Sequence, residues 1–198
     1  VNENPISSIT PAPAAICISK DLTLDGKPSK GTSPYTQLWT DVDAISISSK
    51  TAQTITINTP NAKTYSLAYT VTDKNGCTGT DNISVTVNAL PNVSITAPKT
   101  TLCRKDAAIT LSGTGNSGTW SPNTIVSSTG SFDPQDADVT EDPSKNAITY
   151  TYTDANGCTN SASIDITVMP MPSVTLTGNT TACIYDGSFK ITPNLNGG

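Results

Sequence analysis

The chain contains two stretches of nearly the same sequence, Tyr69-Thr70-Val71-Thr72-Asp73-Lys74-Asn75-Gly76-Cys77-Thr78 and Tyr150-Thr151-Tyr152-Thr153-Asp154-Ala155-Asn156-Gly157-Cys158-Thr159. In both, apolar or aromatic residues alternate with threonines up to the turn. Alternation with period two predicts a strand with one buried and one solvent-facing side. Asn-Gly between two such runs predicts a β-hairpin, because both residues tolerate positive φ. The alternation resumes in Ile83–Val87 and Ile164–Val168, so the sequence predicts two antiparallel hairpins of one design.

The two hairpins belong to a longer repeat. Pro5 and Cys17 return 86 residues later as Pro91 and Cys103, and a third copy opens at Pro172. Units of this length bury a core of their own, so we expect tandem modules rather than solenoid turns. The predicted boundaries are 1–90, 91–171 and 172–198, called the first, second and third repeat below.

The third repeat is expected to hold only the first two strands of a module. Two strands cannot cover their own apolar face. We therefore expect it to be completed by more sequence of the same chain or by strands of another chain. Since Val1 is not a start methionine, we expect the chain to be an internal piece of a longer precursor.

The remaining strands are expected to be short, and no window combines helical periodicity with suitable caps. They are predicted at Ile6–Thr10, Leu22–Leu24, Thr54–Ile57, Val93–Thr96, Ile109–Leu111, Gly130–Phe132, Leu176–Thr177 and Phe189–Ile191. Trp39 and Trp120 each lie 38 residues before the hairpin cysteine. This constancy favours core positions over the alternative, exposed platforms for stacking sugars. Tyr35, in the longer loop of the first repeat, is the better candidate for an exposed contact.

The composition excludes several classes of function. Hydrophobic residues make up 35% of the chain and charged residues 14%, against about 45–50% and about 25% in globular proteins. The net charge is −5, and the eleven Lys and Arg residues are scattered, so binding to nucleic acid is not expected. No apolar run is long enough to span a bilayer, and we expect no membrane insertion.

Catalysis has little support in this sequence. The chain has no histidine, so the common general base and the Ser or Cys triads are missing. Gly113–Gly118 matches GxGxxG, but Thr119-Trp120-Ser121-Pro122 cannot open the helix that a dinucleotide site needs. We expect a non-enzyme that needs no cofactor.

The five cysteines predict disulfides in an oxidising, extracellular compartment. One pair recurs in each complete repeat, so we predict the bonds Cys17–Cys77 and Cys103–Cys158. Each would add roughly 4 kcal/mol of stability by the chain-entropy argument. Cys183 is expected to be unpaired within these residues. A zinc site is excluded because there is neither a CxxC nor a histidine.

Two acidic features have a functional and a structural interpretation. Asp133, Asp136 and Asp138, with Glu141 and Asp142 behind them, could ligate calcium through their carboxylates. The cluster lacks the regular alternation and central glycine of an EF-hand loop, which favours a solvated acidic loop. Asp73 and Asp154 precede turns, which favours acceptors for backbone N–H groups over functional carboxylates.

The tyrosine-rich strand, the Thr-Asp-x-Asn-Gly-Cys-Thr turn and the closing strand Ile83–Val87 resemble the immunoglobulin-like and PKD-like modules of bacterial surface proteins. The chain looks most like the repeats of giant SprB-type adhesins, which gliding Bacteroidota export by type IX secretion. The resemblance implies an all-β fold of tandem Ig-like/PKD-like antiparallel sandwiches with one disulfide per domain. The hairpin cysteines follow the turn, whereas the antibody cysteine precedes it, so the disulfide is expected near one end of the sandwich.

The resemblance also implies a role at the cell surface. The segment would be a spacer or adhesion module in gliding or attachment, with neighbouring repeats as partners and surface polysaccharide or other cell-surface proteins as further candidates. Two alternatives stay open. The modules could be accessory domains of a secreted polysaccharide-degrading enzyme or peptidase, or a subunit of an extracellular fibre.

Overall fold

The computed structural model describes residues 3–12, 14–41, 43, 45–58, 61–115, 117–136, 138–139, 146–171, 173–177 and 192–196. All regular elements within these residues are β-strands, which confirms the predicted all-β class. The chain divides into two compact units. The first unit is Val1–Asn92 with Thr153–Asn160, and the second is Val93–Tyr152 with Ser161–Gly198. In the described part of the chain no helix is long and apolar enough to cross a membrane.

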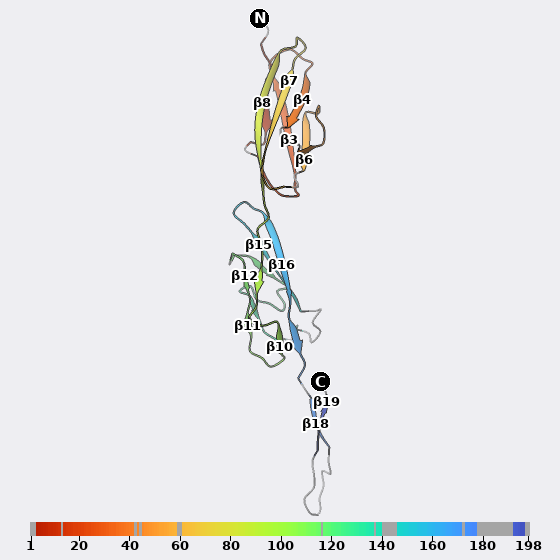
Figure 1. Cartoon of the computed structure of the whole chain (residues 1–198), viewed down its shortest axis with the longest axis vertical. Coiled ribbons are helices and arrows are strands. Elements are labelled where there is room, and N and C mark those ends of the chain that lie inside the picture. Colours follow the sequence, from red (N-terminus) through yellow and green to blue (C-terminus); the bar gives the residue numbers. More distant parts are fainter. Residues whose placement is uncertain are drawn as a thin grey trace, which may run out of the picture. The chain divides into compact units, whose positions relative to one another are not determined.

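The first unit is a sandwich of two four-stranded sheets (Figure 1). One sheet has the order β1 (Ile6–Thr10), β3 (Asp21–Ser29), β6 (Thr54–Asn58) and β5 (Ser46–Ile47). The other has the order β2 (Ala14–Cys17), β8 (Thr78–Asn88), β7 (Thr64–Thr72) and β4 (Thr36–Asp41). Neighbouring strands are antiparallel except β2, which runs parallel to β8.

Period-two alternation builds the core of this sandwich. Along β7 the residues Tyr65, Leu67, Tyr69 and Val71 are buried, and the residues between them are not. The β7–β8 hairpin pairs from Thr72↔Thr78 to Thr64↔Thr86, which confirms the prediction from the Asn-Gly turn. Side chains from both sheets meet in one apolar cluster: Leu24, Ile55 and Ile57 from one, Trp39, Leu67 and Val85 from the other.

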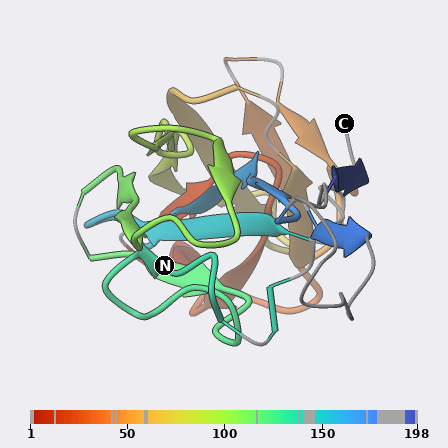
Figure 2. The ribbon, with the colours of Figure 1, turned by 90° about the horizontal axis from the view of Figure 1, so that it is seen from below.

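The second unit repeats this strand pattern with shorter pieces. The pairs are β9 (Ile95–Thr96) with β12 (Ser112–Gly113), β11 (Ile109–Thr110) with β14 (Ser131–Phe132), and β10 (Thr101–Cys103) with β17 (Thr167–Met169). A three-stranded sheet has the order β13 (Thr119–Ser121), β15 (Ala147–Thr153) and β16 (Thr159–Asp165). Figure 2 shows the shorter strands and loops, in green, around the long β15 and β16, in cyan to blue. As in the first unit, the strand that carries the first cysteine, β10, runs parallel to its partner.

The third repeat contributes two described strands. β18 (Ser173–Thr177) and β19 (Thr192–Asn196) pair antiparallel, from Ser173↔Asn196 to Thr177↔Thr192. The predicted strand Leu176–Thr177 lies in β18, whereas Phe189–Ile191 and Cys183 lie outside the described residues. The compact units group Thr153–Asn160 with the first repeat and 172–198 with the second, and the three predicted repeat boundaries stay a prediction.

Candidate functional site

A disulfide joins Cys17 to Cys158, with the Cα atoms 5.6 Å apart and a sequence separation of 141 residues. Both segments belong to the first unit. Cys77 and Cys103 are free thiols. The predicted pairings Cys17–Cys77 and Cys103–Cys158 are therefore wrong, although a disulfide was rightly expected.

The parallel strand β2 explains the error. Cys17 lies opposite Asn88, the last residue of β8, whereas Cys77 directly precedes Thr78, the first residue of β8. The eleven residues of β8 span roughly 35 Å at about 3.3 Å per residue. A disulfide needs Cα atoms within about 7 Å. An antiparallel β2 would bring Cys17 to the start of β8 beside Cys77, but the parallel β2 places the two cysteines at opposite ends of β8.

The second repeat has the same arrangement. Cys103 lies opposite Met169, the last residue of β17, and Cys158 directly precedes β16. Each complete repeat therefore carries one strand cysteine (Cys17 or Cys103) and one hairpin cysteine (Cys77 or Cys158), at opposite ends of its last strand or strand pair.

The two hairpin cysteines are held by the same turn. Asp154 Oδ1 accepts hydrogen bonds from the N–H groups of Asn156 and Cys158, both at 2.9 Å. Asp73 Oδ1 accepts the corresponding bonds from Asn75 and Cys77, also at 2.9 Å. These bonds confirm that the two aspartates act as turn acceptors. Gly157, at φ 79°, occupies the left-handed region that a glycine tolerates best.

Asp73 also accepts a hydrogen bond from outside its turn, because its Oδ2 accepts the N–H of Thr32 at 3.0 Å. The residue is 5% exposed. Burial raises the pKa of the Asp73 carboxyl, but backbone hydrogen bonds from Thr32, Cys77 and Asn75 outweigh it and lower the pKa below its ordinary value. The ionised form therefore holds the Cys77 turn.

The two strand cysteines also share one backbone setting. Ile18 N donates to Asn88 O at 2.9 Å, and Lys20 N donates to Cys17 O at 3.1 Å. In the second repeat Arg104 N donates to Met169 O at 3.1 Å, and Asp106 N donates to Cys103 O at 2.9 Å. Each strand cysteine thus ends its strand in a tight turn beside the last residue of its parallel partner.

The Cys103 turn has an added anchor in the carboxylate of Asp106. Asp106 Oδ2 accepts Lys99 Nζ at 2.7 Å and Cys103 N at 3.0 Å. The Lys99 ammonium and then the Cys103 N–H lower the pKa of the Asp106 carboxyl below its ordinary value. Cys103 itself is exposed and Cys77 is partly buried.

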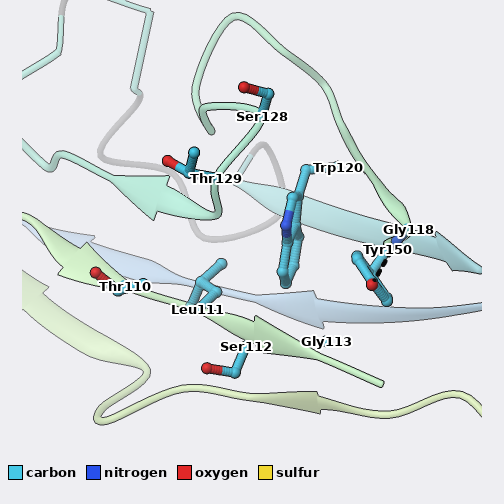
Figure 3. A pocket seen from close by; sticks show the side chains of 9 residues that line it. All are labelled: Thr110, Leu111, Ser112, Gly113, Gly118, Trp120, Ser128, Thr129 and Tyr150. Carbon is cyan, nitrogen blue, oxygen red and sulfur yellow. Dashed lines mark hydrogen bonds between the residues drawn. The ribbon is translucent and has the colours of Figure 1, made fainter. Parts of the chain in front are cut away.

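A second candidate site is an aromatic pocket in the second unit. Trp120 from β13 and Tyr150 from β15 lie with ring centroids 4.5 Å apart, and a cavity of about 210 Å³ opens beside them (Figure 3). Its other lining residues are Thr110, Leu111, Ser112, Gly113, Gly118, Ser128 and Thr129. A Cβ on Gly113 would collide with the Tyr150 ring, so glycine is needed for this close packing.

Hydrogen bonds hold Tyr150 in the pocket wall. Its hydroxyl accepts the N–H of Gly118 at 2.8 Å and donates to Thr114 O at 2.9 Å, the first of which is drawn in Figure 3. Gly118 leads into a strand, β13, and not into a helix, so the GxGxxG stretch has no dinucleotide-binding geometry.

In the first unit the corresponding aromatic pair, Trp39 and Tyr69, is buried. Trp39 is fully buried, lies 4.6 Å from Tyr69, and donates through Nε1 to Ala52 O at 2.8 Å. The predicted core position of Trp39 is confirmed, whereas Trp120 is only partly buried. Tyr35 is also partly buried against the core and donates to Lys30 O at 2.6 Å.

The acidic loop uses two of its carboxylates locally. Asp133 Oδ1 accepts Gln135 N at 2.9 Å, and Asp136 Oδ1 accepts Asp138 N at 3.1 Å. Glu141 and Asp142 lie outside the described residues. Among the residues that are described, no three His, Cys, Asp or Glu side chains gather as a metal site. The solvated acidic loop stays the prediction, with calcium binding by Asp133, Asp136 and Asp138 as the alternative, and thermal melts with calcium or with a chelator would test it.

Residues 15–87 match the family model described as "K319L-like, PKD domain". Similar solved structures include the PKD domain of human KIAA0319, 16% identical, covering 46% of this chain and 87% of that one, with a TM-score of 0.39. The fibronectin(III)-like modules of CbhA from Clostridium thermocellum are 18% identical, covering 83% and 95%, with a TM-score of 0.38. A search of curated proteins found no match.

A nucleoside hydrolase-related hypothetical protein from Saccharophagus degradans, associated with carbohydrate metabolism, is 16% identical. The similarity covers 44% of this chain and 26% of that protein, with a TM-score of 0.38, so the chain spans about a quarter of its length. Modules of the PKD-like and Ig-like class are typical of adhesion or extracellular proteins and are usually non-catalytic. The family match and the disulfide indicate an extracellular domain, and residues 15–87 form a PKD-like module.

Proposed function

We propose that this segment is a tension-bearing spacer of a secreted bacterial surface protein, without catalytic activity of its own. The observation that carries the proposal is the bond between Cys17 and Cys158. It links the strand cysteine of the first repeat to the hairpin cysteine of the second. A spacer that projects an adhesive part from the cell surface has to resist extension, and this bond supplies that resistance.

The covalent path explains the resistance. Force applied to the two ends of the chain passes from Cys17 through the sulfur atoms to Cys158 and bypasses the residues between them. The bypassed stretch, 141 residues by sequence separation, would extend by about 490 Å at about 3.5 Å per residue. That stretch includes β3–β8 and β9–β15, so unfolding of these strands adds no length to the loaded path.

The same bond stabilises the folded chain at rest. Closing a loop of 141 residues removes conformational entropy from the unfolded chain, which stabilises the fold by about 5 kcal/mol in the chain-entropy treatment. The low hydrophobic content of 35% leaves a thin core in each unit, so a contribution of this size is large against a typical stability of about 5–15 kcal/mol.

Single-molecule pulling on the oxidised chain, held at its two ends, tests the proposal. We expect the maximum extension to be about 490 Å shorter than after reduction with dithiothreitol. Cys17→Ser should reach the long extension without reductant. Cys77→Ser is the matched control, because Cys77 is a free thiol, and should behave like the parent chain. Equal extensions of the oxidised and reduced chains would refute the role.

Within this function, the adhesin is the identity that we favour. The turn motif and the tandem repeats support a segment of a SprB-type adhesin at the cell surface, in gliding or attachment, with type IX secretion as its route. Accessory modules of a secreted polysaccharide-degrading enzyme or peptidase, and a subunit of an extracellular fibre, are the alternatives. The flanking sequence discriminates these: more repeats favour the adhesin, a catalytic domain favours the enzyme, and a short gene favours the fibre.

A second candidate function is binding of surface polysaccharide in the aromatic pocket. The observation that favours it is the contrast between Trp120, partly exposed beside a cavity, and Trp39, fully buried. The Trp120 ring supplies apolar contact area, and polar residues, Thr110, Ser112 and Ser128 among them, line the rest of the cavity.

Titration with laminarihexaose, cellohexaose and chitohexaose, followed by tryptophan fluorescence and calorimetry, tests this function. We expect one of the three to bind, and Trp120→Ala to weaken its binding at least tenfold. Tyr35→Ala lies outside the pocket and is the control, with unchanged affinity expected. Equal affinities of the parent chain and Trp120→Ala would exclude the pocket.

A further inference from the structure

Among the residues that line the aromatic pocket, Trp120 supplies the ring on which a ligand can stack. It is partly buried and lies at the cavity (Figure 3), whereas Tyr150, the other aromatic residue in the wall, is only 2% exposed. The cavity of about 210 Å³ is smaller than the roughly 300–1,000 Å³ that hold drug-sized ligands. One sugar ring therefore suits this site better than several consecutive rings of a chain.

The indole N–H of Trp120 is a hydrogen-bond donor without an acceptor in the described part of the chain. In the first unit the corresponding donor, Trp39 Nε1, is taken up by Ala52 O at 2.8 Å. The buried side-chain atoms that lack a partner, within the described residues, are Ser7 Oγ and Gln37 Oε1. The N–H of Trp120 is not one of them and is therefore open to solvent, where an oxygen of a ligand can accept from it.

The Trp120 ring is held in position by the protein itself. Its centroid lies 4.5 Å from that of Tyr150, whose hydroxyl is fixed by Gly118 N and Thr114 O. Gly130 packs so closely that a Cβ on it would lie 3.2 Å from two atoms of the indole, and its φ of 83° favours glycine as well. A ring that is already positioned loses little side-chain entropy on binding, which matters most for a small ligand.

The charge around the cavity favours a neutral ligand. None of the nine residues that line it carries a charge. An acidic sugar would bring a carboxylate into the cavity without a lining cation to pair with, which costs free energy. The net charge of −5 repels such a ligand as well.

We propose that the aromatic pocket binds one uncharged sugar residue, with the sugar ring stacked on Trp120 and one of its oxygens accepting from Trp120 Nε1. This specificity rests on the sugar binding named above as the second candidate function. It restricts the ligand to a terminal residue of a neutral glycan, at a chain end or a branch tip. An interior residue has a neighbour on each side to accommodate, whereas a terminal residue has one, which suits a cavity of this size.

The test follows the indole N–H signals of the ¹⁵N-labelled full chain by NMR. The chain has two tryptophans, so the Trp39 signal is an internal control for the Trp120 signal. The probes are the methyl glycosides of glucose, galactose and mannose, the matching uronic acids, in which a carboxylate replaces the hydroxymethyl group, and a hexasaccharide of each neutral sugar.

We expect one neutral methyl glycoside to shift the Trp120 signal and leave the Trp39 signal in place, with a Kd of about 1 mM, ordinary for a ligand of this size. Its hexasaccharide should bind less than fivefold more tightly, and its uronic acid at least fivefold more weakly. Trp120→Phe keeps an aromatic face and removes the N–H, and should weaken binding at least fivefold, measured by saturation-transfer NMR of the sugar. Its thermal unfolding is compared with that of the parent, and Tyr35→Ala is the control with unchanged affinity.

The other outcomes separate this specificity from sugar binding itself. A hexasaccharide that binds fivefold or more tightly than its methyl glycoside would show that the site takes the interior of a chain, and a uronic acid that binds within fivefold would show that the site accepts charge. In both cases this inference fails while polysaccharide binding stands. If no probe of either length shifts the Trp120 signal, both fail.

Discussion

At the scale of single residues, the carboxylate of Asp73 connects a hairpin cysteine to the fold. It accepts the N–H groups of Asn75, Cys77 and Thr32, the last from 41 residues away in the sequence. The Asp-x-Asn-Gly-Cys motif predicts the two local bonds, because an aspartate before a turn accepts from the next residues. The bond to Thr32 depends on tertiary packing, which the motif does not contain.

The lowered pKa of Asp73 predicts how stability depends on pH. The folded state favours the ionised carboxylate, so its contribution is complete above the ordinary pKa of about 3.9 and is lost as the pH falls through the lower pKa of the folded state. We expect Asp73→Asn to be less stable than the parent at pH 7 and to lose less stability on acidification. Urea unfolding at neutral and acidic pH measures this, with Asp165→Asn on the exposed side of β16 as the control. Parallel pH profiles of Asp73→Asn and the parent would contradict the assignment.

At the scale of elements, the sequence predicts the long strands and misses some of the short ones, β2 among them. β7 alternates over nine residues, so its pattern is clear. β2 is Ala14–Cys17, too short to show a period and without a turn signal that would set its direction. Its parallel pairing with β8 follows from packing over a long sequence distance. The cysteine pairing depended on that direction, which is why the bonded pair could not be predicted from the repeat alone.

The two tryptophans differ in burial, and this predicts a difference in how much each stabilises the fold. β4 and β13 carry Trp39 and Trp120 at equivalent positions, but only Trp39 is fully buried. Replacing a buried Trp by Ala costs about 3–5 kcal/mol. We expect Trp39→Ala to lower the free energy of unfolding by that amount and Trp120→Ala by less than half of it, measured by urea unfolding of each variant. A larger loss for Trp120→Ala would mean that the aromatic pocket is structural and not a binding site.

At the scale of the whole molecule, cutting the backbone between the repeats tests whether the disulfide joins two repeats or lies within one. A specific protease site inserted in the linker between Ala89 and Leu90, after the end of β8, lets the backbone be cut between the first and second repeats. The bond between Cys17 and Cys158 crosses this cut, whereas pairs within each repeat would leave every bond on one side of it. We expect the cut chain to run as one species on a denaturing gel without reductant and as two after reduction.

Cys158→Ser supplies the control for this experiment, because it removes the crossing bond and leaves the linker unchanged. It should separate into two fragments without reductant, while Cys103→Ser, which lacks only a free thiol, should stay joined. If the parent chain separated without reductant, no disulfide would cross the cut. The force path would then run through both cores, and the thin cores alone would have to resist the tension.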